Sequence, residues 1–456
     1  MPERSAVDTA QSVLYFQSIV GTREVMRMTA LDSHGGDVDF GQIVGKLHTA
    51  DFNRVVNSPW YRDAVYERFS EEEYQRRFTV TQEKMSALGL DVLIACGGPN
   101  HWSWGSGMRW LSGYWEWHGV SAYVVVPLEG EPVLVPGPGG AHREAIRRLT
   151  PLSDVRQSRR GKHADVIVGI VKEWGLADGT VGFSYVDPVY EDYLPVNQQR
   201  RLEEELPEAT FEFVGDFFHD LVHVKSPEEI ACVRKAGELM DQAMYAMIAA
   251  ARPGVTEYQL AAAATNAVLQ GGGQMDFTII GATRMDDPRM IFGNPWPSAR
   301  ELQRGDIIIN EIACGYNGYS VQIGTPVCIG EPPAWIRDFF EDIVLPGFDL
   351  MAEQLRPGKT WEDVRRAGTF FQEKGYDGRP LHLHSLDFVS HMPHVMWDHV
   401  SAGDHEMELV PGIAAMLEPT VITPDGLLGI FFGRSFVITE DGHDEVTRFP
   451  HELIVV

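Results

Sequence analysis

Cysteine is scarce in this sequence, and its cysteines do not stand in metal-binding or redox pairs. Four occur in 456 residues: Cys96, Cys232, Cys314 and Cys328. Because no CxxC pair is present, the sequence lacks both a disulfide framework and the close ligand spacing of structural zinc. Free, mostly buried thiols in a reducing cytoplasm are therefore expected.

Basic residues are also few for the length of the chain. Lys and Arg number 38 against 65 Asp and Glu, which gives a formal net charge of −27 at pH 7. Nucleic acids and anionic membranes are bound through clustered basic side chains, so both are disfavoured as partners. Solubility is the simplest explanation of the acidity itself.

Long apolar runs are missing as well. No stretch approaches the roughly 20 apolar residues that cross a bilayer. The apolar run within residues 1–21 is too short for the hydrophobic region of a signal peptide. The sequence thus predicts a soluble, cytoplasmic protein with no membrane partner.

The composition that remains is ordinary for a globular protein, with 44% hydrophobic and 23% charged residues. A chain of 456 residues is too long for one ordinary core, so two domains are expected. Alternating strands and helices up to about residue 215 predict an α/β domain with a mainly buried sheet. The second half predicts helices followed by antiparallel strands. The predicted fold class is therefore α/β plus α+β, with domains at residues 1–222 and 223–456.

The second half opens with a strong helix signal. Ser226 is a suitable N-cap, Pro227 fits the first helical turn, and Glu229 completes a capping box. The Ala- and Met-rich stretch that follows predicts a long helix.

A hairpin is predicted at residues 305–330, "GDIIINEIACGYNGYSVQIGTPVCIG", where two apolar runs flank a Gly-containing turn. The hairpin places Glu311 and Gln322 near its facing ends. A metal-dependent hydrolase would need two carboxylates here, and the second position is an amide.

From about Lys225 onward the chain resembles the pita-bread fold of aminopeptidase P, prolidase, creatinase and the dimethylsulfoniopropionate lyases of that superfamily. The resemblance is carried by "VKSPEEIACVRKAGELMDQA", "RPGVTEYQLA", "RGDIIINEIACGYNGYS", "HSLDFVSHMP", "LVPGIAAMLEPTV" and "GIFFGRSFVITEDGHDEVTRFP", in the order of the family. The first half, with "MRWLSGY" before a strand pair, resembles a creatinase-type amino-terminal domain. The resemblance implies a creatinase-like α/β domain, then a pita-bread catalytic domain, paired as a homodimer.

Metallopeptidases of this fold bind two divalent ions through two Asp, one His and two Glu. The resemblance places at these positions Glu311, Gln322, His384, Glu418 and Gly433. Gln322 offers only a neutral amide and Gly433 offers no side chain, whereas dications require several anionic oxygens or imidazoles. Loop 281–298 also lacks the His of the family. These departures predict a converted site without a metal ion or cofactor.

The favoured interpretation is a metal-independent, non-peptidase enzyme that acts by acid–base chemistry on a small metabolite. The substrate is expected to be aromatic or cationic and to bear a carboxylate. Elimination or decarboxylation by a catabolic lyase asks less of a site without metal-bound hydroxide than amide hydrolysis does. Three alternatives stay open: a creatinase-like C–N hydrolase; a mononuclear metal-dependent Xaa-Pro peptidase or dimethylsulfoniopropionate-lyase-like enzyme; and a non-catalytic binding module.

Four residues are predicted to be catalytic, two of them in a histidine cluster at residues 382–399: His384, His391, Glu418 and Glu311. Histidine titrates nearest neutrality, which suits a general acid or base, although an isolated His is more often a core residue. Glu418 lies in an apolar strand, where a carboxylate is either paired or driven towards protonation. A structural ion pair is the alternative role.

Five further residues are predicted to bind substrate: Gln322, Arg289, Arg434, Trp115 and Trp117. A planar guanidinium matches a carboxylate bidentately, and tryptophans can enclose an aromatic or cationic group. A hairpin amide, surface arginines and core packing are the corresponding structural roles.

Overall fold

The computed structural model describes residues 65–97, 106–116, 120–137, 142–158, 162–184, 194–387, 392–401 and 404–456. Within these ranges no helix is both long enough and apolar enough to cross a membrane. The four cysteines are free thiols, and Cys96, Cys314 and Cys328 are buried.

The amino-terminal half holds a mixed sheet with the strand order β4-β3-β2-β1-β5-β6. Its strands are β1 (Val92–Gly97), β2 (Ala122–Pro127), β3 (Val133–Val135), β4 (Asp154–Val155), β5 (Thr180–Phe183) and β6 (Thr210–Phe213). The central strand β1 is buried along its whole length and pairs antiparallel with β2 but parallel with β5. Burial on both faces explains why its sequence is a continuous apolar run.

Helices accompany this sheet: α4 (Glu71–Leu88), α5 (Gly107–Ser112), α6 (Arg143–Leu149), α7 (His163–Glu173), α8 (Val196–Glu205) and α9 (His219–His223). Helix α4 begins where the Ser70 side chain accepts a hydrogen bond from the Glu73 amide. It ends at Gly89, whose φ of 70° is a left-handed conformation that glycine adopts without strain. The predicted α/β character of this half is confirmed.

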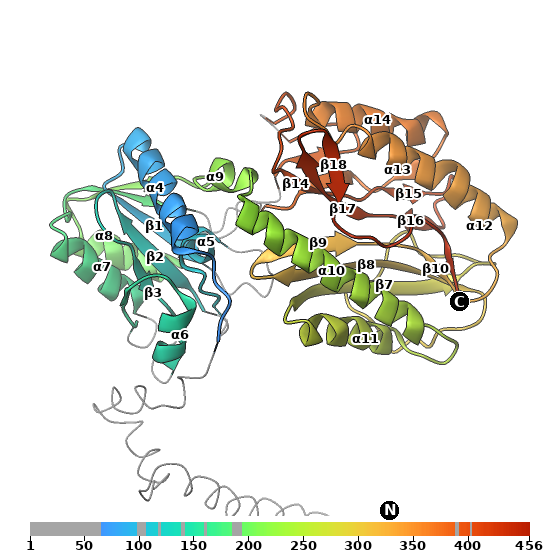
Figure 1. Cartoon of the computed structure of the whole chain (residues 1–456), viewed down its shortest axis with the longest axis horizontal. Coiled ribbons are helices and arrows are strands. Elements are labelled where there is room, and N and C mark those ends of the chain that lie inside the picture. Colours follow the sequence, from blue (N-terminus) through green and yellow to red (C-terminus); the bar gives the residue numbers. More distant parts are fainter. Residues whose placement is uncertain are drawn as a thin grey trace, which may run out of the picture. The chain divides into compact units, whose positions relative to one another are not determined.

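The carboxy-terminal half contains a sheet with the order β19-β10-β8-β7, and β9 also pairs with β8. The strands are β7 (Gln274–Arg284), β8 (Asp306–Tyr316), β9 (Tyr319–Ile323), β10 (Val327–Cys328) and β19 (Ile454–Val455). Helices α10 (Pro227–Ala250) and α11 (Glu257–Gln270) run across it (Figure 1). The Ser226–Glu229 capping box that starts α10 is present, as predicted.

A second antiparallel sheet of this half has the order β13-β12-β14-β17-β18, and a smaller one has the order β11-β15-β16. The strands are β11 (Asp377–Gly378), β12 (Leu381–Ser385), β13 (His394–Met396), β14 (Ala414–Leu417), β15 (Thr420–Ile422), β16 (Gly429–Phe431), β17 (Arg434–Thr439) and β18 (Gly442–Glu445). The accompanying helices are α12 (Ala334–Phe339), a π-helical turn at Phe340–Val344, α13 (Leu345–Ala352) and α14 (Trp361–Glu373).

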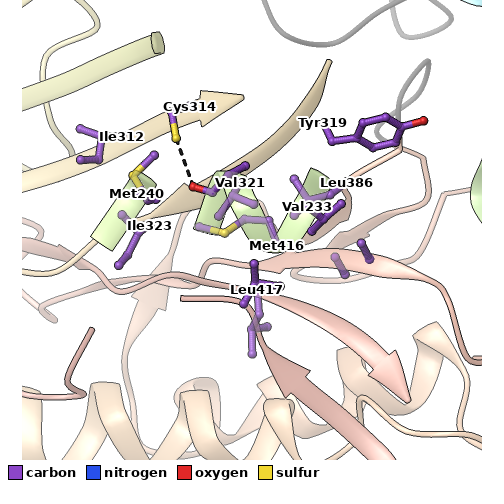
Figure 2. Packing of buried hydrophobic residues seen from close by; sticks show 14 of the residues in the cluster. Val233, Met240, Ile312, Cys314, Tyr319, Val321, Ile323, Leu386, Met416 and Leu417 are labelled. Atoms are coloured by element: carbon purple, nitrogen blue, oxygen red, sulfur yellow. Dashed lines mark hydrogen bonds between the residues drawn. The ribbon is translucent and has the colours of Figure 1, made fainter. Parts of the chain in front are cut away.

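Helix α10 and the β8–β9 hairpin share one apolar core (Figure 2). Val233 of α10 belongs to the same buried cluster as Val321 and Ile323 of β9. The Cys314 thiol donates a hydrogen bond to the Ala236 carbonyl oxygen at 3.4 Å. Each buried aliphatic side chain contributes about 1.5–3 kcal/mol, so this core holds the hairpin firmly in place.

A buried ionic network joins α4 to α10 and β9. Arg77 of α4 is 1% exposed and bonds Glu73 at 2.8 Å and Glu229 at 3.1 Å. The Tyr319 hydroxyl donates to Glu229 at 2.5 Å and the Trp110 indole donates at 2.9 Å. The network fixes the start of β9, the strand that carries Gln322.

The whole fold is mixed α/β with an amino-terminal domain and a pita-bread domain, so the predicted fold class is confirmed. The predicted boundary between residues 222 and 223 stays a prediction, and it falls within the short helix α9.

Candidate functional site

The β8–β9 hairpin brings Glu311 and Gln322 to one face of its sheet. Gln322 pairs across the hairpin with Ala313, which is two positions from Glu311 on β8. Side chains two positions apart on a strand share a face, so Glu311 and Gln322 are diagonal neighbours. Both side chains are buried, Glu311 at 8% exposure and Gln322 at 1%.

His384 and Glu418 come together from β12 and the end of β14. His384 pairs with Met416, and the Glu418 amide donates to the His382 carbonyl oxygen at 2.7 Å. This register places Nε2 of His384 3.9 Å from Oε1 of Glu418, and both side chains are buried. The predicted pairing of these two residues in space is therefore present, while their catalytic role stays a prediction.

The backbone sets the proton position on His384. Its Nδ1 lies 2.8 Å from the Ser385 carbonyl oxygen, which can only accept, so Nδ1 carries the proton. Burial lowers the pKa of His384 to about 4. At neutral pH the imidazole is therefore uncharged, and its Nε2 lone pair faces Glu418.

The two carboxyl groups of the site repel one another. Burial raises the pKa of Glu311 to about 7, although the charge of Arg379 lowers it. Burial and the Glu311 charge together raise the pKa of Glu418 well above its usual value, again against Arg379. Two buried like charges cannot both ionise cheaply, so near neutrality the pair holds at least one proton. Glu418 is the more strongly protonated member of the pair, because both burial and the Glu311 charge raise its pKa.

The raised pKa of Glu311 predicts a pH-dependent stability. Between about pH 4.5 and 7 the folded protein keeps a proton on Glu311 that the unfolded chain has lost. Because the native state then binds more protons, the free energy of unfolding decreases as the pH rises through this window. Glu311→Gln is neutral at every pH. Its stability should therefore fall less than that of the wild type between pH 5 and 8, by up to about 3 kcal/mol.

Denaturant unfolding at several pH values measures this difference. Glu331→Gln is the matched control, because the Glu331 side chain is 78% exposed, and it should follow the wild type. Identical pH dependences of Glu311→Gln and the wild type would contradict the protonation assigned to Glu311.

Two buried oxygens at the site have no hydrogen-bond partner among the residues that the structure describes. They are Oε1 of Gln322 and Oε2 of Glu418. The backbone of Gln322 is held by reciprocal bonds with the Ser435 hydroxyl at 3.0 and 2.9 Å, which fixes the strand but not the amide group. Buried polar atoms in folded proteins are nearly always bonded to protein, water or ligand, so both oxygens are available to a ligand.

Glycine occupies two facing positions beside these residues. Gly324 and Gly433 exchange backbone hydrogen bonds of 3.1 Å in both directions. A Cβ on Gly433 would lie 2.4 Å from Cε of Met416 and 3.0 Å from Cε1 of Phe431. A Glu side chain at position 433 would therefore require Met416 and Phe431 to move.

These positions do not fit the two-ion centre implied by the fold. Position 433 has no side chain, and one placed there would meet Met416 and Phe431, while position 322 offers only an amide oxygen. In the described ranges no three His, Cys, Asp or Glu side chains are grouped so as to hold a metal ion.

The close packing at Gly324 gives a stability prediction. A Cβ there would lie 2.1 Å from Cδ1 of Phe431 and 2.7 Å from the Asn310 carbonyl oxygen, which belongs to the β8 backbone. Gly324→Ala should therefore lower the free energy of unfolding by about 1–3 kcal/mol, as overpacking does. Gly442→Ala is the control, because a Cβ there meets nothing within 4 Å. Equal stabilities of the two variants in urea unfolding would contradict the assigned packing.

The two arginines predicted to clamp a substrate are engaged elsewhere. Arg289 is 70% exposed and pairs with Asp287 at 3.0 Å. Arg434 is fully buried, and its guanidinium donates to the carbonyl oxygens of Gly324, Gly433 and Pro450, each at 2.8 Å. Arg434 thus braces the paired glycines, because three backbone acceptors occupy donors that a carboxylate would need.

Of the remaining predicted residues, the structure describes only Trp115. Trp115 is half-buried, with the Arg109 guanidinium 5.8 Å from its ring centroid. His391 and Trp117 lie outside the described residues. Nothing in the structure tests their predicted roles.

Two other described histidines of the cluster, His382 and His399, have different environments. His382 stacks on Trp397 with ring centroids 4.6 Å apart, and burial lowers its pKa to about 3. A register shift between Leu381 and Leu383 interrupts the alternation of β12. His399 is 62% exposed beside Asp398.

Sequence reasoning missed Arg379, the cation whose charge acts on both Glu311 and Glu418. It follows the two-residue strand β11 and lies in none of the motifs that carry the resemblance. A basic residue close to the histidine cluster is the one signal that could have indicated it.

Two protein families match consecutive parts of the chain. Residues 77–221 match the Creatinase/Prolidase N-terminal domain, and residues 231–440 match Metallopeptidase family M24. Among solved structures, X-Pro aminopeptidase from Thermotoga maritima superimposes with a TM-score of 0.69 at 20% identity. The match covers 84% of this chain and 99% of that one, which shows the shared fold.

Two curated relatives match over nearly their whole length. The ectoine hydrolase of Halomonas elongata is 26% identical over 416 residues, covering 85% of this chain and 98% of the relative. The probable dipeptidase PepE of Mycobacterium tuberculosis is 29% identical over 399 residues, with the same coverage of 85% and 98%.

These relatives correct the predicted reaction. The prediction of a metal-independent lyase is wrong, because the relatives are hydrolases or peptidases and the matched family is one of metallopeptidases. The missing ligands bear on how water is activated and not on which bond is cleaved. Acid and base groups that would serve an elimination serve hydrolysis equally well.

Proposed function

Because this chain has the two-domain architecture of the pita-bread superfamily of aminopeptidase P, prolidase and creatinase, we propose that it is a hydrolase of a carbon–nitrogen bond in a small metabolite. Its relatives include an ectoine hydrolase, a creatinase and dipeptidases, and a dipeptidase by definition hydrolyses the C–N bond of a peptide.

The single observation that carries the proposal is the buried trio of Glu311, Glu418 and His384. Glu311 of β8 and Glu418, which directly follows β14, lie close enough for the charge of one to act on the other. The imidazole stands beside Glu418 with its Nε2 lone pair towards Oε1. Hydrolysis needs one group to take a proton and one to give a proton, and a pair holding a single proton supplies both.

The roles follow from the protonation states. Glu311, which titrates near neutrality, accepts a proton from the attacking water, and a carbon–oxygen bond forms. Glu418, which is protonated, donates its proton to the leaving nitrogen as the carbon–nitrogen bond breaks. Transfer of the proton from Glu311 back to Glu418 restores the pair.

His384 and Gln322 position the reacting groups. The neutral imidazole lies beside Glu418 with Nε2 3.9 Å from Oε1, which is beyond hydrogen-bond distance, and its ring limits where the carboxyl group can lie. The Gln322 side-chain oxygen, which has no partner among the described residues, accepts a hydrogen bond from an N–H or O–H of the substrate.

Release of an amine from a substrate panel tests this proposal. The panel comprises dipeptides, N-acyl amino acids, cyclic amides and amidines, each incubated with the purified full chain. Release of an amine together with the matching acid is the expected result: in equal amounts from a linear amide, within one molecule from a cyclic amide, and with an amide in place of the acid from an amidine. A product with a new carbon–carbon double bond, or binding of panel members without any turnover, would overturn it.

We also propose an assembly and a cellular location for the protein. A homodimer in the cytoplasm, with a small molecule as the other partner and neither nucleic acid nor membrane bound, is what the sequence predicts. The acidic charge of −27 supports the exclusion of polyanionic partners. Light scattering of the purified chain at working concentration tests the dimer.

A further inference from the structure

Arg379 is held next to the candidate site by its own backbone. It directly follows β11, which pairs antiparallel with β15, and the Arg379 amide donates to the Thr420 carbonyl oxygen at 3.2 Å. Thr420 stands two positions after Glu418 on the same chain segment. The guanidinium is therefore attached to the strand pair that also places Glu418.

An aromatic ring supports the Arg379 side chain. Its Cζ lies 3.6 Å from the ring centroid of Phe292, a close cation–π contact. Phe292 in turn meets Phe431 of β16 edge to face, with ring centroids 5.4 Å apart. Phe431 is the residue that fills the space beside Gly324 and Gly433. One aromatic pair thus links the guanidinium to the packing around Gly324 and Gly433.

The loop that carries Phe292 is anchored at both ends. The Met290 amide donates to the Leu427 carbonyl oxygen at 2.9 Å, and the Met290 carbonyl oxygen accepts from the Gly429 amide at 3.0 Å. At the other end, the buried Glu257 accepts from the Ser298 hydroxyl at 2.6 Å. Because both ends are tied to the sheet and to α11, Phe292 and the guanidinium against it have defined positions.

The Arg379 guanidinium is charged, half-buried and unpaired within the described part of the chain, where it makes no ion pair and no side-chain hydrogen bond. Its charge lowers the pKa of Glu311 and of Glu418, although among the described residues it forms no hydrogen bond with either carboxyl group. An arginine in this state has donors to offer to an anion, and its planar fork matches a carboxylate.

We propose that Arg379, backed by Phe292, binds a carboxylate of the substrate and so restricts the enzyme to carboxylate-bearing metabolites. This inference rests on the proposed hydrolase function. The substrate would place its carboxylate on the guanidinium and its C–N bond at Glu311 and Glu418. The clamp that the sequence assigned to Arg289 and Arg434 is thereby assigned to a different arginine.

Matched pairs of neutral and anionic probes test the proposal. N-acetylglycine, N-acetylproline and glycylproline are compared with their carboxamides, which differ only in the anionic group. The wild type should bind at least one carboxylate about 10–100-fold more tightly than its carboxamide, measured by titration calorimetry or ligand-observed NMR. Arg379→Gln should abolish this preference.

Three further variants separate recognition from charge balance. Arg379→Lys keeps the charge but loses the fork, so its preference should fall to an intermediate value. Phe292→Leu should weaken carboxylate binding while leaving carboxamide binding unchanged. Arg366→Gln, at a 70% exposed arginine paired with Glu362 on α14, is the control and should match the wild type.

The outcomes distinguish this inference from the proposed function. A carboxylate preference without turnover of any panel member leaves Arg379 as an anion site and overturns the hydrolase. Turnover with equal use of carboxylates and carboxamides overturns the Arg379 proposal alone. Equal losses for both probe types in Arg379→Gln would also overturn it, because a merely structural arginine would affect both alike.

Discussion

Glu418→Gln is expected to lower kcat by about 10²–10⁴-fold, the usual scale for losing a general acid or base. Glutamine keeps the shape of the side chain but cannot transfer the proton that Glu418 holds beside His384. Because the amide is neutral like the protonated acid, the variant should fold normally. Steady-state kinetics on the hydrolysed panel member, with circular dichroism as the folding check, measures both effects.

His384→Ala should reduce turnover by a similar factor, because it removes the neutral imidazole that lies beside Glu418. His399→Ala is the matched control, since His399 is 62% exposed and hydrogen-bonds Asp398 rather than a site residue. Wild-type kcat in both Glu418→Gln and His384→Ala would refute the catalytic assignment. A non-catalytic binding module would then account better for the chain.

Lys225→Met is expected to lower the free energy of unfolding by about 3–5 kcal/mol, as removal of one partner from a buried ion pair does. Lys225 and Asp387 pair directly, and both side chains are 0% exposed. The Lys225 ammonium also donates to the His223 carbonyl oxygen at 3.0 Å, and His223 Nδ1 bonds Asp387 at 2.8 Å. Although burial raises it, Lys225 and His223 hold the pKa of Asp387 below its usual value.

Urea unfolding of three variants checks this expectation. Lys235→Met is the control, because Lys235 is 41% exposed and its pair with Glu238 is a surface contact of α10 worth at most about 1 kcal/mol. The double variant with Asp387→Asn should recover part of the loss, since the uncompensated charge is then removed. A loss for Lys225→Met no larger than that for Lys235→Met would show that the pair does not stabilise the fold.

Local signals in the sequence were sufficient for the elements that carry most of the site. The Ser226–Glu229 capping box marks the start of α10, and the apolar runs on either side of Glu311 mark β8. The amide at position 322 and the glycine at 433 are visible as departures from the family pattern. What the sequence did not indicate is why position 433 is glycine, because Phe431 and Met416 reach it only in the folded sheet.

Arg379 and Arg434 show where sequence reasoning ends. Arg434 begins strand β17 within a family motif, yet its side chain turns inward to three backbone carbonyl oxygens. Arg379 has no motif and depends on Phe292, a residue in a distant loop. The environment of a guanidinium is set by tertiary contacts, so neither periodicity nor local spacing distinguishes a buried brace from a residue that faces the site.

The packing around Gly433 connects position 433, through two aromatic rings, to the Arg379 side chain. A single change of Gly433 to Glu would force its side chain against Met416 and Phe431, and Phe431 is also the ring on which Phe292 and then Arg379 rest. Paired metal ligands would also require an acid at position 322, where the side chain is an amide. Any shift of Phe431 that made room at position 433 would be passed to Phe292 and to the guanidinium against it, so a new ligand there would also change the proposed carboxylate recognition.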